Sequence, residues 1–354
     1  MFELTFLGCL GGPMEGSTCA LLVKPATSSY LTLKPGELLC IDGGLGLALL
    51  TETIYHEQRT AQPYSKTIEL LASQSNIKSP QDICEAVVTT PFAEIQGLPF
   101  NEARKIFGRL SNYLITHPHL DHIAGLVVNL LGFDAENPKS VYGLEVCMLA
   151  LSAHIFNNII WPDLPQHKLL LLNPVNYEHP FSPLHGVYSV TMFELSHGVN
   201  YKLLAFLINY KPADAGDNAS ADQEHMLLVF GDFELDRVSG ASTNIHVWQQ
   251  VAPLVARGQL RGIVVECSHG DNLNDSLLFG HLKLSDLIHE LATFKELIEA
   301  EGGSINGLHV VVNHVKDLDS DVRLQILKEL RDGASQHQLD IKILLPLSGV
   351  SLVI

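Results

Sequence analysis

The sequence is poor in basic residues. Its 354 residues contain 22 Lys and Arg against 39 Asp and Glu, which gives a formal net charge of -17 at pH 7. No cluster of Lys or Arg could follow a phosphate backbone, so we exclude long nucleic acids as partners. A small anion remains compatible with this charge, because bound cations would reverse the local field of an acidic surface.

The chain also lacks paired cysteines and long apolar runs. Its six cysteines are scattered without a CxxC pair, and several stand in apolar stretches, which favours buried, reduced thiols over disulfides or metal ligands. No apolar stretch is long enough to span a bilayer, and residues 1–10 enter a strand-like pattern without a basic leader. We therefore expect a cytoplasmic protein that makes no contact with a membrane.

Hydrophobic residues make up 46% of the chain, enough for a large core. We predict one domain over residues 1–354, with a partly helical insertion at about 47–109 that has helical stretches near 47–57 and 83–88. Strands dominate the first part of the chain, and strands alternate with helices after residue 232. This order predicts an α/β fold with the layers of an αββα sandwich.

A cluster of histidines follows a predicted strand at 113–115. His117 and His119 are two positions apart on extended chain, so both imidazoles project to one side, and Asp121 and His122 open the next helix. A lone histidine is more often a satisfied core or surface residue than a ligand. Three histidines and an aspartate in six positions are costly to place together unless a cation relieves the crowding, so we predict a metal site.

The remaining donors are expected at the ends of other strands, because a rigid sheet holds a site in place. Three apolar runs end in suitable residues, which are His197, Asp232 and His314. We predict two Zn²⁺ ions, or other divalent cations, bridged by Asp232: one is held by His117, His119 and His197, and the other by Asp121, His122 and His314.

Two further histidines compete with His314 for the last place. His281 precedes a helix, and we favour it as an acid or phosphate donor beside the metals, with Glu266 as its partner. His269 is expected to face solvent, as are His56, His154, His167 and His337. Asp42 precedes two glycines and is either a turn residue or a carboxylate that orients a ligand histidine.

The His117-x-His119-x-Asp121-His122 pattern resembles the signature of the metallo-β-lactamase superfamily. The whole stretch from His117 to Leu126 is similar to one branch of it, the class II cyclic-nucleotide phosphodiesterases of the fungal low-affinity cyclic-AMP type. Further matching segments are Gly11-Gly12-Pro13, Ile41-Asp42-Gly43-Gly44, Ile160–Leu164, Val265-Glu266-Cys267-Ser268, Gly280-His281-Leu282 and His314-Val315-Lys316. The chain departs from the family in having Asn313, where relatives have Thr, before the strand-end histidine.

This resemblance implies the metallo-β-lactamase fold and hydrolysis of 3′,5′-cyclic AMP, and of cyclic GMP as a second candidate, to the 5′-monophosphate. A zinc-bridged hydroxide would attack phosphorus, with Asp121 taking the proton of the water and His281 protonating the 3′ oxygen. The resemblance is compatible with a homodimer, for which no residue pattern gives evidence. Of the aromatic residues near the motifs, Phe156, Trp161 and Phe279 are each expected in the core rather than in the base pocket.

Other functions remain open at this point. A tRNA-3′-processing endonuclease would use the same metal set, but it needs a basic arm that this acidic sequence does not show. A glyoxalase-like or lactamase-like hydrolase would be distinguished by its substrates. A metal-free scaffold that binds cyclic nucleotide has little support, because every expected ligand is present.

Overall fold

Two mixed β-sheets face each other in the computed structural model, which describes residues 1–65, 77–130, 136–198, 202–210, 224–316 and 322–354. In spatial order, the eight-stranded sheet consists of β4 (Val87–Thr89), β14 (Ser351–Val353), β1 (Phe2–Gly8), β2 (Ala20–Pro25), β3 (Leu39–Ile41), β5 (Asn112–Leu114), β6 (Lys139–Gly143) and β7 (Leu170–Pro174). The six-stranded sheet consists of β13 (Lys342–Leu344), β12 (His309–Asn313), β11 (Leu260–Glu266), β10 (His225–Phe230), β9 (Lys202–Tyr210) and β8 (Tyr188–Ser196).

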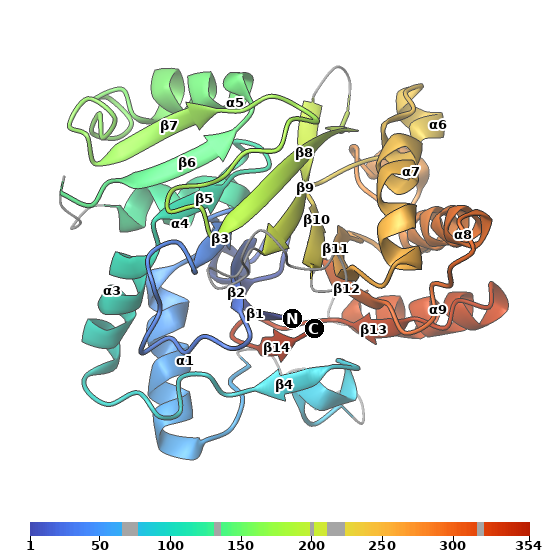
Figure 1. Ribbon diagram of the computed structural model, residues 1–354, viewed down its shortest axis with the longest axis horizontal. Coiled ribbons are helices and arrows are strands. Elements are labelled where there is room, and N and C mark those ends of the chain that lie inside the picture. The colour runs from blue at the N-terminus through green and yellow to red at the C-terminus, as the bar shows by residue number, and fades with distance from the viewer. Residues whose placement is uncertain (66–76, 131–135, 199–201, 211–223, 317–321) are drawn as a thin grey trace.

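Helices cover the outer faces of both sheets (Figure 1). On the side of the larger sheet lie α1 (Leu47–Thr60), α3 (Pro99–Arg109), α4 (Leu120–Asn129) and α5 (Glu145–Ala150), the last continued by a π-helical turn at Leu151–Ile155. On the other side lie α6 (Asp236–Ser239), α7 (Thr243–Ala256), α8 (Leu284–Ala300) and α9 (Val322–Gln336). Short 3₁₀ turns occur at Glu15–Ser17, Pro80–Asp82 and Asp275–Leu277. The layers are therefore those of the αββα sandwich that the sequence predicts.

Side-chain chemistry explains how these layers pack. The central strands β11 and β12 are valine-rich and almost wholly buried, as expected for parallel strands that are covered on both faces. Trp248 on α7 is fully buried, and its ring centroid lies 4.9 Å from that of Phe230 and 4.5 Å from that of Phe294. These aromatic contacts join the smaller sheet to α7 and α8.

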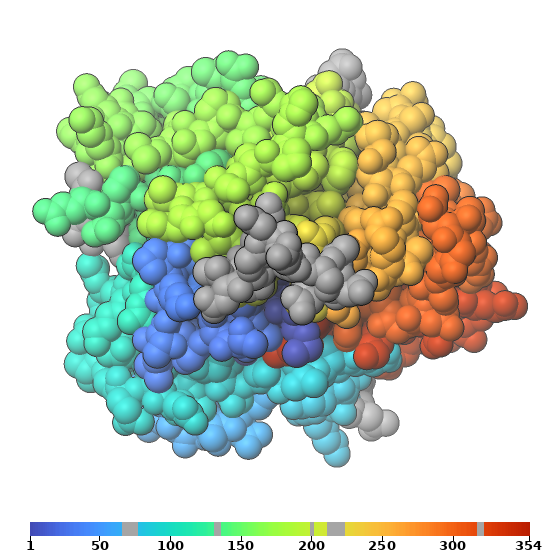
Figure 2. Space-filling view, viewed as in Figure 1, coloured from blue at the N-terminus to red at the C-terminus, as the bar shows by residue number. Residues whose placement is uncertain are grey.

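The two ends of the chain complete one sheet. Strand β1 pairs antiparallel with both β2 and β14, and the backbone N–H of Phe2 donates to the carbonyl of Ile354 at 2.9 Å. The space-filling view shows the blue N-terminal region and the C-terminal helices in orange and red packed into one continuous body (Figure 2). None of the helices in the described part of the chain is both long and apolar enough to cross a membrane.

Strand direction brings several strand ends to one edge. Strands β3, β5, β6 and β7 run parallel, as do β10, β11, β12 and β13, while β9 runs opposite to β8 and β10. The carboxyl ends of β8, β10, β11 and β12 therefore lie at the same edge of the smaller sheet. Ligands of open α/β sheets bind at such an edge, which is where the predicted ligands stand.

The region from 47 to 109 differs in part from the sequence-based prediction. The helix expected near 47–57 is present as α1, and α3 is a second helix that packs against it. The helix expected at 83–88 is wrong: residues Val87–Thr89 form β4, which pairs with β14. Pairing at the sheet edge satisfies the backbone groups of this short segment, which outweighs its local preference. Residues 66–76 lie outside the described part.

Candidate metal centre

The predicted ligands gather at the edge where the two sheets meet. His117 follows β5, and His119 is the residue immediately before α4, whose first turn carries Asp121 and His122. The other donors follow strands of the smaller sheet: His197 follows β8, Asp232 stands two residues after β10, and His314 follows β12. All seven predicted ligands are thus brought together by strand ends and one helix start.

Asp232 lies at the middle of this group. One carboxylate oxygen is 3.2 Å from His314 Nε2 and 3.5 Å from His122 Nε2, and the other is 3.6 Å from His117 Nε2. Burial alone would raise the pKa of Asp232, but the imidazoles of His314, His122 and His117 outweigh it and hold that pKa well below its usual value. A charged carboxylate between two groups of imidazoles is what a bridging ligand requires.

His117, His119 and His197 form the first group. The Nε2 atom of His117 lies 2.8 Å from Nδ1 of His119, and the ring centroid of His197 is 5.7 Å from that of His119. Burial lowers the pKa of all three histidines, which favours their neutral forms. Neutral imidazole is the form that binds a metal ion.

Asp121, His122 and His314 form the second group. One oxygen of Asp121 lies 3.3 Å from His314 Nε2 and 3.6 Å from His122 Nε2. In the described part of the chain, His122 Nε2 is buried without a hydrogen-bond partner. A buried orphan nitrogen that faces carboxylates is costly in a protein alone, so this donor set fits a divalent cation.

Asp42 holds two of these histidines in place. Its carboxylate accepts hydrogen bonds from the backbone N–H of Thr116 at 2.8 Å and from His122 Nδ1 at 2.7 Å. The Thr116 hydroxyl lies 2.9 Å from Asp42 and 3.0 Å from His117 Nδ1, so it links the same carboxylate to His117. Asp42 has a left-handed backbone with φ of 55°, which is uncommon for a non-glycine residue. Of the two sequence-based alternatives, the geometry is that of the orienting carboxylate.

Glu266 plays a comparable part on the other side. One of its oxygens accepts a 2.8 Å hydrogen bond from the Ser268 hydroxyl, which lies 3.0 Å from His314 Nδ1. Its other oxygen lies 3.1 Å from His281 Nδ1 and accepts the backbone N–H of Phe233 at 2.9 Å. Glu266 thus contacts His281 directly and reaches His314 through the Ser268 hydroxyl.

His281 differs from His314 in its contacts. Both of its ring nitrogens have partners, since Nδ1 contacts Glu266 and Nε2 lies 2.9 Å from the Lys316 ammonium. Burial alone would lower the pKa of His281, but the nearby Glu266 carboxylate outweighs it and raises that pKa. A histidine with engaged nitrogens and a raised pKa suits proton transfer better than metal binding.

Two glycines allow the chain to approach the ligands closely. A Cβ atom at Gly11 would lie 2.3 Å from the His314 ring, so only glycine fits there. The Gly280 carbonyl accepts a 2.7 Å hydrogen bond from His197 Nδ1, and a Cβ at Gly280 would lie 2.9 Å from the same nitrogen. The glycines of two sequence motifs thus support individual ligands.

Some residues at the centre were not expected there. Cys19 is buried, and its sulfur lies near the ring nitrogens of His122 and His314; burial, followed by nearby carboxylates, raises its pKa well above the ordinary value. Lys316, Thr116 and Ser268 had no predicted role. Their positions depend on contacts between distant strands, and only the motifs that contain them could have pointed to them.

Two expectations about side-chain burial are wrong. His269 is not solvent-facing, because it is only 6% exposed beside Lys283 at the start of α8. Phe279 is not a core residue, because 76% of its surface is exposed, whereas Phe156 is buried as expected. Phe279 stands on a turn with φ of 50°, which directs the chain back so that Gly280 can reach His197. All six cysteines are buried and free of disulfides, as predicted.

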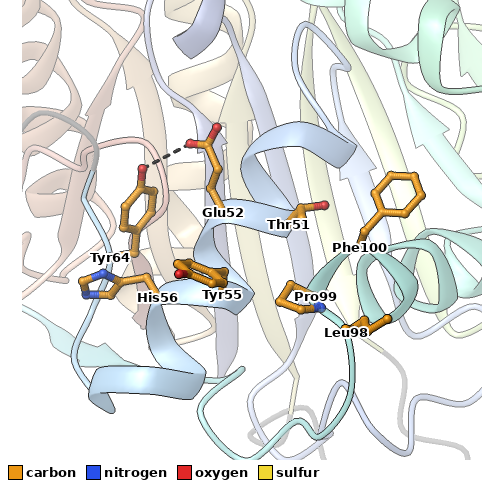
Figure 3. A pocket seen from close by; sticks show the side chains of 8 residues that line it. All are labelled: Thr51, Glu52, Tyr55, His56, Tyr64, Leu98, Pro99 and Phe100. Atoms are coloured by element: carbon orange, nitrogen blue, oxygen red, sulfur yellow. Dashed lines mark hydrogen bonds between the residues drawn. The ribbon is translucent and has the colours of Figure 1, made fainter.

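A separate pocket of about 650 Å³ lies on α1 and the start of α3 (Figure 3). Its lining residues are Thr51, Glu52, Tyr55, His56, Tyr64, Leu98, Pro99 and Phe100. The one carboxylate in this lining, that of Glu52, already accepts a 3.1 Å hydrogen bond from the Tyr64 hydroxyl. None of the predicted metal ligands lines this pocket.

Comparison with known proteins agrees with this geometry. The family model of class-II cAMP phosphodiesterases matches residues 27–349. A 3′,5′-cyclic-nucleotide phosphodiesterase of Candida albicans is 33% identical over 427 aligned residues that cover 100% of both chains. The 3′,5′-cyclic-nucleotide phosphodiesterase 1 of Saccharomyces cerevisiae is 32% identical over 379 residues, or 99% of each chain.

Solved structures show the same fold. The crystal structure of unliganded yeast PDE1 superimposes with a TM-score of 0.83 and 28% identity, and covers 100% of this chain and 99% of that one. The metallo-β-lactamase fold protein YhfI of Bacillus subtilis has a TM-score of 0.53 at 12% identity over 99% of this chain and 98% of its own. The fold is therefore that of the metallo-β-lactamases, and the family match favours the phosphodiesterase over the tRNA-processing alternative. The chain belongs to the class-II cAMP phosphodiesterases.

Proposed function

We propose that this chain hydrolyses 3′,5′-cyclic AMP, and cyclic GMP as a second substrate, to the nucleoside 5′-monophosphate. Its family is named for cyclic AMP, and its fungal relatives are named as 3′,5′-cyclic-nucleotide phosphodiesterases. The single observation that carries the proposal is the position of the Asp232 carboxylate between two groups of imidazoles. Such a site acts on a phosphodiester with water as nucleophile.

The chain's donors support two divalent cations, for which we propose Zn²⁺. We assign His117, His119 and His197 to one ion and Asp121, His122 and His314 to the other, with Asp232 between them. When bound, the cations would acidify a water molecule and neutralise negative charge on the phosphate oxygens. The buried nitrogen of His122 and the close approach of Gly11 to His314 support this assignment.

His281 is the acid in this proposal. The P–O3′ bond breaks as the water oxygen bonds to phosphorus, so the 3′ oxygen needs a proton. His281 lies at the rim of the cluster, with Nδ1 3.9 Å from Asp232, and Glu266 raises its pKa and orients its ring. Glu266 therefore acts through His281 by stabilising the protonated imidazole.

Asp121 is the proposed acceptor of the proton from the attacking water. Its side chain is 28% exposed, whereas Asp232 is almost completely buried, so Asp121 is the carboxylate that faces the open side. Burial alone would raise the pKa of Asp121, but His314 and His122 lower it below its usual value. Asp121 is therefore a weaker base than an ordinary carboxylate. Measuring turnover and metal content of Asp121→Asn together separates loss of the proton acceptor from loss of a metal ligand.

The decisive experiment identifies the product. Purified protein is incubated with cyclic AMP or cyclic GMP, with and without chelator, and the monophosphates are separated by chromatography. We expect the 5′-monophosphate, no turnover with chelator, and recovery when Zn²⁺ is restored. A 3′-monophosphate, or full turnover in excess chelator, would contradict the proposal.

Variants test the assigned roles. His197→Ala and His314→Ala should lose bound metal, measured by mass spectrometry, whereas the exposed His154→Ala should keep it. His281→Ala should keep its metal but lose about 10²–10⁴-fold in kcat, the usual contribution of a positioned acid. Unchanged turnover in His281→Ala would remove its role as the acid.

A further inference from the structure

Lys316 brings a positive charge to the rim of the metal centre. Its ammonium lies 2.9 Å from Nε2 of His281, whose ring is stacked on that of His314 with centroids 5.0 Å apart. Its backbone N–H donates to the carbonyl of Ser268 at 3.0 Å, so the main chain is anchored beside the cluster. Both the backbone and the side chain of Lys316 are therefore held toward the site.

The Lys316 ammonium has no carboxylate partner among the residues that the structure describes. Its Nζ instead donates to Nε2 of His281, which accepts this hydrogen bond in its unprotonated form. Several other lysines pair with carboxylates, as Lys105 does with Glu102 at 2.7 Å, and the buried Lys139 donates to the carbonyls of Phe107 and Gly108. A half-buried cation whose partner is neutral gains from contact with an anion.

A purely positioning role does not account for this contact. His281 is already held by Glu266 through Nδ1, and Glu266 is in turn fixed by the backbone N–H of Phe233. The second contact, from the Lys316 ammonium to Nε2, adds little to the orientation of the His281 ring. It also covers the nitrogen that must face the leaving oxygen, so Lys316 has to release His281 when substrate binds.

We propose that Lys316 binds a non-bridging oxygen of the cyclic phosphate, a contact that rests on the phosphodiester hydrolysis proposed above. In the free protein its ammonium donates to the unprotonated Nε2 of His281. When substrate binds, the ammonium moves to the phosphate, and Nε2 takes up a proton from solvent that it then gives to the 3′ oxygen. In a chain with a net charge of -17, a cation beside the site also offsets repulsion of the anionic substrate. Lys316 is thereby a substrate-binding residue.

The test compares Lys316→Met, Lys316→Arg and the control Lys105→Met, which removes the same charge from an exposed pair on α3. Steady-state kinetics with cyclic AMP and calorimetric binding of 5′-AMP are measured on protein of equal metal content and melting temperature. We expect Lys316→Met to raise KM and the Kd for 5′-AMP by about tenfold or more, as for loss of a charge-assisted hydrogen bond. Both constants of Lys316→Arg should stay within a few-fold of the wild-type values. Those of Lys105→Met should equal the wild-type values.

The outcomes separate this proposal from the one on which it rests. If wild type hydrolyses cyclic AMP and Lys316→Met binds 5′-AMP as tightly as wild type does, Lys316 does not bind phosphate. A fall in kcat with unchanged Kd would instead assign it to positioning His281 and would overturn the proposal. If wild type hydrolyses no cyclic nucleotide, the proposed function fails first, and the role of Lys316 fails with it.

Discussion

Replacing Asp42 with Asn should prevent His122 from binding metal while leaving the fold intact. The amide oxygen can still accept the Thr116 backbone N–H that now bonds to Asp42 at 2.8 Å. The amide NH₂ then takes the place of the oxygen that lies 2.7 Å from His122 Nδ1. Because NH₂ can only donate, His122 must accept at Nδ1 and carry its proton on Nε2. That is the nitrogen facing Asp121 and Asp232, and once protonated it cannot coordinate a cation.

The expected loss follows from the role of Asp42. Removing a group that orients a ligand histidine costs about 10- to 100-fold in metal affinity, or about 1.4 to 2.7 kcal/mol. Asp42 also contacts Thr116, which reaches His117, so one substitution disturbs a ligand in each of the two groups. We therefore expect Asp42→Asn to fall at the upper end of this range.

Competition with a chromophoric chelator measures the change directly. The free Zn²⁺ concentration at half-occupancy is compared among wild type, Asp42→Asn and Asp286→Asn, with melting temperature as the check on folding. Asp286 is a buried aspartate that pairs with Arg237 at 2.9 Å, away from the cluster, so its variant controls for the loss of a buried carboxylate. Equal affinity in wild type and Asp42→Asn would refute the tautomer argument.

Three other substitutions have defined outcomes. Gly11→Ala would place a methyl group 2.3 Å from His314, so it should lose bound metal by mass spectrometry, whereas Gly108→Ala, with open space around its Cβ, should not. Burial raises the pKa of Glu57 to about 8, so between pH 5 and 8 its carboxyl is protonated in the folded state and ionised in the unfolded state. The contribution of Glu57 to the free energy of unfolding should therefore fall by about 1.4 kcal/mol per pH unit over this range. Chemical denaturation should show that Glu57→Gln lacks this slope; identical pH profiles would contradict the assignment. Glu266→Gln removes the charge that raises the pKa of His281, so the alkaline limb of its kcat profile should begin at lower pH, with unchanged metal content.

Local sequence determined the parts of this protein that depend on near neighbours. The spacing of His117, His119, Asp121 and His122 requires only a strand end and a helix start, so it could be read without a structure. The pattern at 47–57 predicted a helix, and this helix is present as α1. Asp232 and His314 were identified as candidate ligands because each follows an apolar run, which is also a local feature of the sequence.

Tertiary structure decided which distant groups meet. Nothing in the local pattern joins Lys316 to His281, links Thr116 to Asp42, or brings Cys19 beside the second group of ligands, because each contact crosses between strands far apart in sequence. The same dependence turned the expected helix at 83–88 into β4, which exists through its pairing with β14. Burial of His269 was missed because exposure depends on what packs above a residue. Periodicity is a property of one segment, whereas pairing and burial are properties of the whole chain.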